Sequence, residues 1–163
     1  MLEESISQLD ILSLEDFLRL KKAESESKGQ KIDWENKKQI WFTSLQKLYN
    51  TVNLWLKSSI KQGLVEISVE NHERIEDYIG SYSVEEMTIK VGFERVFLKP
   101  KGMIVVNAAG RVDLIGEHGN IMLLLLEKNQ EFQWHITIRT DHQKPWPLTQ
   151  ESFADALKWV MSA

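Results

Sequence analysis

The residues best suited to chemistry lie on two segments with the alternating pattern of β-strands. Arg111 and Asp113 are two positions apart, so on a strand their side chains point to the same side. His135 and Arg139 likewise share one side of the segment 132–140. If these polar rows share a sheet face, two guanidinium groups and an imidazole converge in a ligand-binding site for a carboxylate or phosphate. The alternative is a solvated face, where an Arg–Asp pair contributes less than about 1 kcal/mol.

The histidines do not follow a metal-binding motif. A zinc site needs three or four converging ligands, and the sequence contains only His72, His118, His135 and His142. His135 and His142 are close in sequence, with Asp141 as a third candidate ligand, but the favoured interpretation is surface histidines. His118 is expected to serve the turn in which it lies. We therefore expect no metal and no cofactor.

No catalytic motif of known mechanism is present in the sequence. Nucleophile elbows, phosphate-binding loops and His-Glu-x-x-His helices are missing. The acidic neighbours Glu15–Asp16 and Glu85–Glu86 point in diverging directions, so neither pair can flank a substrate. Cysteine is absent, which excludes disulfides and a thiol nucleophile. The stretch 109–110 is expected to be a tight reversal between strands. These observations favour a protein that is not an enzyme.

Composition and charge further restrict the class of protein. The 163 residues carry a net charge of −4, with 20 basic and 24 acidic residues, whereas binding to a phosphate polymer relies on a basic surface. Nucleic acid is therefore an unlikely partner. No window approaches the roughly 18 apolar residues of a membrane span, and the acidic start lacks signal-peptide features. A cytoplasmic protein with no membrane partner is expected.

The N-terminal third is predicted to be helical. Residues 1–33 form a helical arm and a flexible connector, with Ser13 as the cap of the first clear helix. A long amphipathic helix follows over 34–62, with Gly63 positioned as its left-handed cap. At 1.5 Å per residue this helix would be about 42 Å long, so it either breaks near residues 50–51 or projects and pairs with a second copy.

Tryptophans mark the long helix and the loop before the last helix. Trp34, Trp41 and Trp55 lie on one stripe, which favours a core role and leaves a homodimer seam as the alternative. Trp146 lies between two prolines that fix its orientation. It either packs under the C-terminal helix or is an interface anchor.

After Gly63 the hydrophobic period changes from 3.6 to 2, which predicts an antiparallel meander of about six to seven strands over 64–140. The connector 71–83 is ambiguous and is expected to contain a helical turn, with its acidic residues solvated. The apolar run 121–126 does not alternate, so it is expected to be central and covered on both faces.

The fold expected is thus α+β: N-terminal helices, an antiparallel sheet, and a C-terminal helix over 149–161 packed on the sheet. The domain 34–163 follows the arm 1–33. This order of strands and one final helix is similar to the pleckstrin-homology-like layout, which implies a binding module. The leading hypothesis is a non-enzymatic protein-interaction module, either with another protein or as a homodimer through the tryptophan-bearing helix. The alternative is a small-molecule (anion) binding protein or enzyme that uses the polar sheet face.

Overall fold

The computed structural model describes residues 13–26, 33–105, 108–137 and 145–162. Contacts within the chain divide it into two units, Met1–Trp34 and Glu35–Ala163. Each unit is described by itself below.

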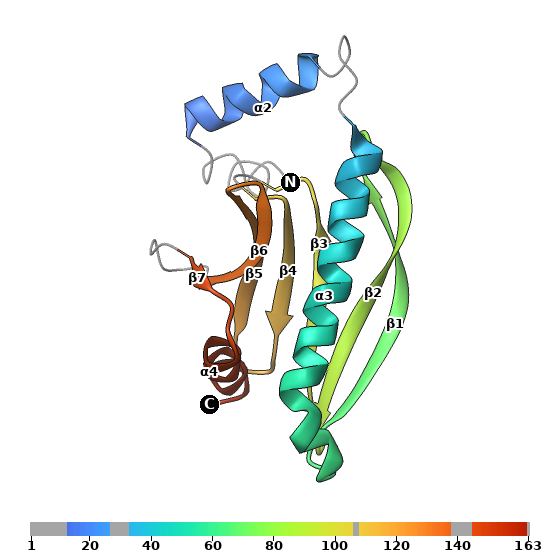
Figure 1. Ribbon diagram of the computed structural model, residues 1–163, viewed down its shortest axis with the longest axis vertical. Coiled ribbons are helices and arrows are strands. Elements are labelled where there is room, and N and C mark those ends of the chain that lie inside the picture. The colour runs from blue at the N-terminus through green and yellow to red at the C-terminus, as the bar shows by residue number, and fades with distance from the viewer. Residues whose placement is uncertain (1–12, 27–32, 106–107, 138–144, 163) are drawn as a thin grey trace. The chain divides into compact units, whose positions relative to one another are not determined.

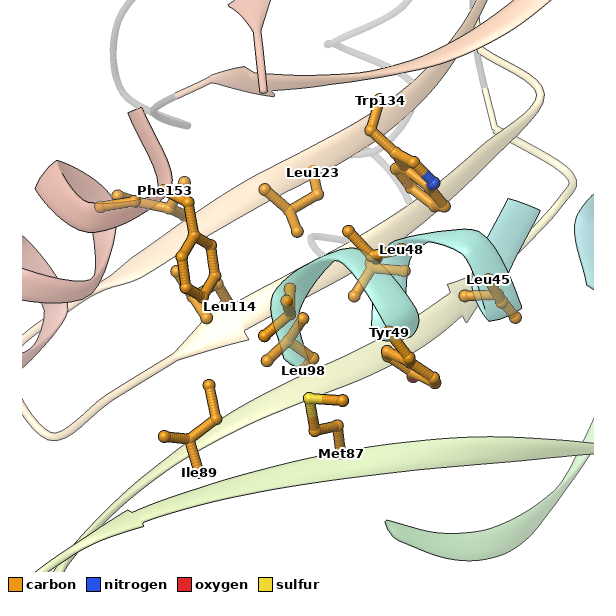
Figure 2. Packing of buried hydrophobic residues seen from close by; sticks show 14 of the residues in the cluster. Leu45, Leu48, Tyr49, Met87, Ile89, Leu98, Leu114, Leu123, Trp134 and Phe153 are labelled. Carbon is orange, nitrogen blue, oxygen red and sulfur yellow. The ribbon is translucent and has the colours of Figure 1, made fainter. Parts of the chain in front are cut away.

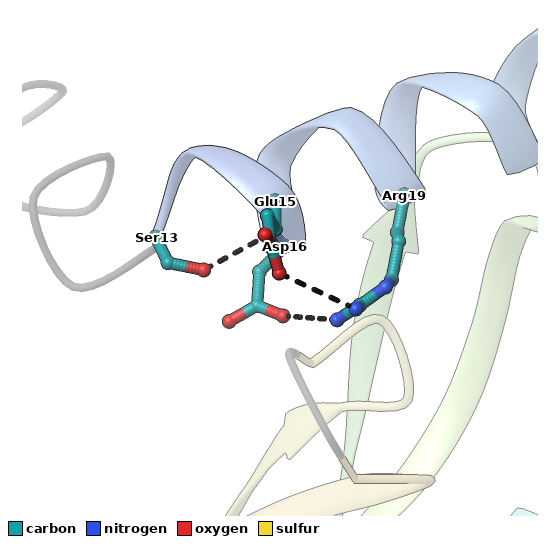
Figure 3. Close-up of polar contacts among 4 residues, drawn as sticks. All are labelled: Ser13, Glu15, Asp16 and Arg19. Atoms are coloured by element: carbon teal, nitrogen blue, oxygen red, sulfur yellow. Dashed lines mark hydrogen bonds and ion pairs between the residues drawn. The ribbon is translucent and has the colours of Figure 1, made fainter.

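The first unit contains helix α2 (Leu14–Glu26). The hydroxyl of Ser13 accepts the Asp16 N–H at 3.1 Å and so caps the helix start, as predicted. Arg19 pairs with Asp16 at 3.0 Å and with Glu15 at 3.6 Å (Figure 3). These ion pairs are exposed, so each contributes only about 0.3–0.5 kcal/mol to the helix.

The second unit is a sheet with helices before and after it, and its seven strands pair in chain order, all antiparallel (Figure 1). This confirms the predicted α+β fold with a meander sheet and a C-terminal helix. The elements in chain order are α3 (Trp34–Lys61), β1 (Glu66–Glu76), β2 (Gly80–Val91), β3 (Glu94–Gly102), β4 (Gly110–Ile115), β5 (Asn120–Lys128), β6 (Glu131–Thr137), β7 (Trp146–Pro147) and α4 (Gln150–Met161).

Helix α3 is continuous over 28 residues, so the predicted break near residues 50–51 is absent. Gly63 ends it with a positive φ of 73°, as predicted. The Leu64 N–H donates to Ser59 O and the Gly63 N–H donates to Ile60 O, both at 3.0 Å. These two bonds form a Schellman motif, which satisfies carbonyl groups that the last helical turn leaves free.

The apolar stripe of α3 packs on one face of the sheet and forms the core of the unit. Figure 2 shows Leu48 of α3 among Leu98, Leu114 and Leu123 of three neighbouring strands, and all four are buried. Helix α4 joins the same core through Phe153, whose ring lies 5.5 Å from that of Trp55. Both helices therefore cover the same sheet face.

Within the described part of this unit, the helices that cover strand β5 lie on one face. Ile121, Leu123 and Leu125 are buried on the helix side. Met122 and Leu124, which point to the other side, are only half-buried. The second cover expected for 121–126 stays a prediction, since the described part of this unit has no further helix and Met122 and Leu124 are nevertheless half-buried.

The segment expected to be an ambiguous connector is a long β-hairpin. Strands β1 and β2 pair without interruption from Glu66 opposite Lys90 to Glu76 opposite Gly80, and Figure 1 shows their strong twist. The predicted helical turn is absent. Tyr78, with a φ of 68°, lies in the reversal instead.

Gly110 does not form the expected reversal. It is the first residue of β4 and pairs with Leu125. A Cβ atom at this position would lie 2.2 Å from Cζ3 of Trp41, so the glycine permits the indole to pack against the strand. Within the predicted meander, the described residues of 103–108 form a single antiparallel bridge between Val105 and Ala108 rather than a longer strand.

Candidate functional site

The sheet side opposite α3 and α4 carries no helix of this unit among the described residues, and it is called the helix-free face. Arg111 of β4 pairs with Leu124 of β5, which in turn pairs with His135 of β6. Directly opposed residues of antiparallel strands project to the same side. The two polar rows of the sequence analysis therefore share this face. Its other side chains on β3 to β6 are Phe97, Lys99, Asp113, Ile115, Met122, Leu126, Gln133 and Thr137.

The most polar feature of this face is a bidentate ion pair within strand β4. Arg111 Nε donates to Asp113 Oδ1 at 2.7 Å, and Nη2 donates to Oδ2 at 3.0 Å. The Asp113 residue is only 3% exposed, and the Arg111 side chain is 25% exposed. The spacing of two residues on a strand produces this pairing. The guanidinium group is thus used to neutralise a buried carboxylate.

Of the remaining two members of the predicted anion site, His135 is the one that lies among the described residues. His135 Nδ1 lies 3.2 Å from the carbonyl oxygen of Gln133, two residues earlier in the same strand. Arg139 lies outside the described residues. The Arg111 guanidinium is directed along its own strand to Asp113 instead of across Leu124 toward His135. The described side chains therefore provide an ion pair and a separate histidine, without a cluster of free donors.

Apolar residues occupy the centre of the helix-free face. Met122, Leu124 and Leu126 project from β5, and each is half-buried. Phe97 and Ile115 are directly opposed on β3 and β4 and are also half-buried. Polar residues of β4 and β6 flank the β5 row on both sides. The face thus has an apolar centre with polar flanks.

The four tryptophans predicted for an interface occupy different environments. Trp41 is fully buried and its ring lies 6.2 Å from that of Trp134, so its side chain is part of the core. Trp55 is half-buried against Phe153. Trp34, the first residue of α3, is half-buried. Trp146 in β7 is 37% exposed and pairs opposite Ile136. Of the tryptophans predicted for the homodimer seam, Trp41 and Trp55 thus pack against aromatic rings of the same chain.

A groove of about 330 Å³ separates α3 from the β6–β7 edge of the sheet. Trp55 of α3 and Phe132 and Trp134 of β6 supply aromatic walls. The Trp134 indole N–H donates to Ser44 O at 2.9 Å, so this donor is already satisfied inside the chain. Neither Arg111 nor His135 lines this groove.

A further polar cluster, which sequence reasoning missed, joins the end of β1 to the chain after β3. Glu76 Oε1 accepts the N–H groups of Met103 at 3.0 Å and Ile104 at 3.1 Å, and Oε2 accepts the Tyr82 hydroxyl. Glu76 was expected to be solvated and is instead half-buried. Burial, followed by the hydrogen bond to Glu76, raises the pKa of Tyr82 above its usual value. No local pattern signals this cluster, since the contacts span 27 and 28 residues.

Comparisons with known proteins give no relative for this fold. No protein-family model matches the sequence, and no curated protein or solved structure matches it. The similarity to the pleckstrin-homology-like layout therefore concerns the order of elements alone. No helix among the described residues combines the length and the apolar character that crossing a bilayer requires.

The ion pair on the helix-free face should be structurally important. Arg111→Ala leaves the buried Asp113 carboxylate uncompensated, and we expect a loss of about 3 kcal/mol in the free energy of unfolding, measured by urea denaturation. The double variant Arg111→Met/Asp113→Leu should recover most of this loss. As a control, Arg19→Ala removes only exposed ion pairs and should cost less than about 1 kcal/mol. Equal, small effects of both single variants would show that the pair is not desolvated.

The Tyr82 environment predicts a loss of stability at alkaline pH. Tyrosine in the unfolded chain ionises near pH 10, and the raised pKa means that the folded state retains the proton to higher pH. This contribution is complete below about pH 10 and declines as the pH rises above it. In Tyr82→Phe, the fall in unfolding free energy between about pH 9 and pH 11 should therefore be smaller. The unchanged chain is the reference, and a slope in Tyr82→Phe identical to that of the unchanged chain would contradict this account.

Proposed function

We propose that this protein is a non-catalytic protein-binding module and that its contact surface is the helix-free face. The observation that carries this proposal is the outward row of β5, which consists of Met122, Leu124 and Leu126. An antiparallel strand with one solvated face usually carries polar residues on that face. Three consecutive outward apolar residues in a central strand are instead typical of a surface that contacts another molecule.

The surroundings of this row support the same proposal. Protein interfaces combine an apolar centre with a polar rim. Here the polar rim consists of Arg111 on one side and of Gln133 and His135 on the other. The bidentate pair holds the Arg111 side chain in one orientation, so little conformational entropy is lost when a partner contacts it.

The chemistry of the face favours a protein over other classes of partner. Small-molecule sites are concave and enclose most of their ligand, whereas these residues lie along the outer side of a sheet. Nucleic acid requires a basic surface, and the chain has a net charge of −4. A second copy of the chain belongs to the same class of partner. Contact through the helix-free face replaces the earlier hypothesis of a seam on α3, whose stripe is buried.

The proposal is tested by site-specific photocrosslinking of the full chain in the cell that makes it. The crosslinking residue replaces Gln133, which is exposed beside Leu126 on the helix-free face. The control position is Ile75 on the edge strand β1, which is 81% exposed. We expect one defined adduct, with another protein or a second copy, from position 133 and none from position 75.

The variant Leu124→Lys should reduce this adduct. It places an unpaired charge at the centre of the contact and should weaken the affinity roughly tenfold or more. Because Leu124 is only half-buried, circular dichroism should show an unchanged fold. No adduct from position 133, the same adducts from both positions, or an adduct that Leu124→Lys leaves unchanged would overturn the proposal.

A further inference from the structure

We propose that Glu94, Glu117 and His118 bind a divalent transition-metal ion of the class of Zn²⁺. Each residue offers one ligand atom, and these three atoms lie within 4.8 Å of one another. Glu94 is half-buried, and the other two residues are exposed. This site does not depend on the proposed contact surface.

The sheet topology brings the three residues together. Glu94 is the first residue of β3, and Glu117 and His118 lie in the turn between β4 and β5. Strands β3 and β4 are antiparallel neighbours, with Phe97 opposite Ile115. The start of β3 and the turn after β4 therefore meet at the same end of the sheet.

The turn that carries two of the ligands is held by the backbone. The Gly116 N–H donates to Gly119 O at 3.0 Å, and the His118 N–H donates to Val160 O of α4 at 2.9 Å. A Cβ atom at Gly116 would lie 2.3 Å from that same carbonyl oxygen, so glycine permits the close approach of the helix. Because hydrogen bonds hold the backbone of this turn, the side chains of Glu117 and His118 start from a fixed position when they bind an ion.

The donor set selects the class of metal. Two carboxylate oxygens and one imidazole nitrogen suit Zn²⁺ and neighbouring transition metals, whereas Ca²⁺ and Mg²⁺ prefer oxygen ligands alone. Ligands at 2.0–2.1 Å around a tetrahedral ion lie about 3.3 Å apart. The side chains of Glu117 and His118 are exposed, and their ligand atoms already lie within 4.8 Å of each other and of that of Glu94. Three protein ligands leave a coordination position for water.

The two carboxylates have no competing cationic partner among the described side chains. Among the described residues, neither Glu94 nor Glu117 belongs to an ion pair with a lysine or arginine. A second group of two glutamates and one histidine lies on the β1–β2 hairpin, and a lysine approaches one of these glutamates. There His72 lies 3.5 Å from Glu70 and 3.9 Å from Glu86, and Lys99 approaches Glu86 at 4.0 Å.

The hairpin group supplies a matched control for the test. Isothermal titration calorimetry with ZnCl₂ is carried out on the full chain without an affinity tag. We expect saturable binding of one ion, retained in His72→Ala and lost or strongly weakened in His118→Ala. Loss of a residue that only hydrogen-bonds to a metal ligand weakens metal binding roughly 10- to 100-fold, so loss of a ligand itself should do at least as much.

A second variant keeps the test valid if His118→Ala does not fold. Glu94→Gln preserves size and removes one charge, and it should also weaken Zn²⁺ binding. Thermal unfolding without metal should show the same midpoint for Glu94→Gln and the unchanged chain. Absence of saturable binding, binding that survives both variants, binding that depends on His72, or equal affinity for Ca²⁺ would overturn the proposal.

Discussion

Packing of the α3 stripe against one face of the sheet is the interaction on which the rest of the structure depends. Trp41 and Leu48 are both buried in this contact. Their burial contributes about 25 cal/mol for each Å² of apolar surface removed from water, which makes such contacts the main favourable term in folding. Gly110 shows how closely the layers approach, since the Trp41 ring occupies the space of an absent side chain.

This packing also determines which surface remains for function. Because α3 buries Trp41 and Leu48 inside the chain, these two side chains are not available to a second copy. Because α4 lies on the same sheet face and contacts α3 through Phe153, the opposite face carries no helix of this unit among the described residues. Because the described helices of this unit cover β5 on one side, Met122 and Leu124 of this strand point away from them. The proposed function follows from this one-sided arrangement.

Much of the architecture could be predicted from local sequence patterns. The change of hydrophobic period after Gly63, the cap at Ser13 and the antiparallel meander depend on neighbouring residues, and the structure confirms them. Features that depend on distant contacts could not be predicted. The run 121–126 fits a strand with one or two covered faces equally well, since both place apolar side chains on each side. The Glu76 cluster likewise requires knowledge of how strongly the β1–β2 hairpin twists.

The central claim, that one side of β5 is covered by helices and the other is open to a partner, is tested most directly by methionine oxidation. Met122 is half-buried on the helix-free face, whereas Met87 is fully buried on the helix side. Dilute peroxide followed by peptide mass spectrometry reports the oxidation rate of each. The structure predicts fast oxidation of Met122 in the isolated chain, with Met87 protected. Equal protection of both residues in the isolated, folded chain would contradict the account.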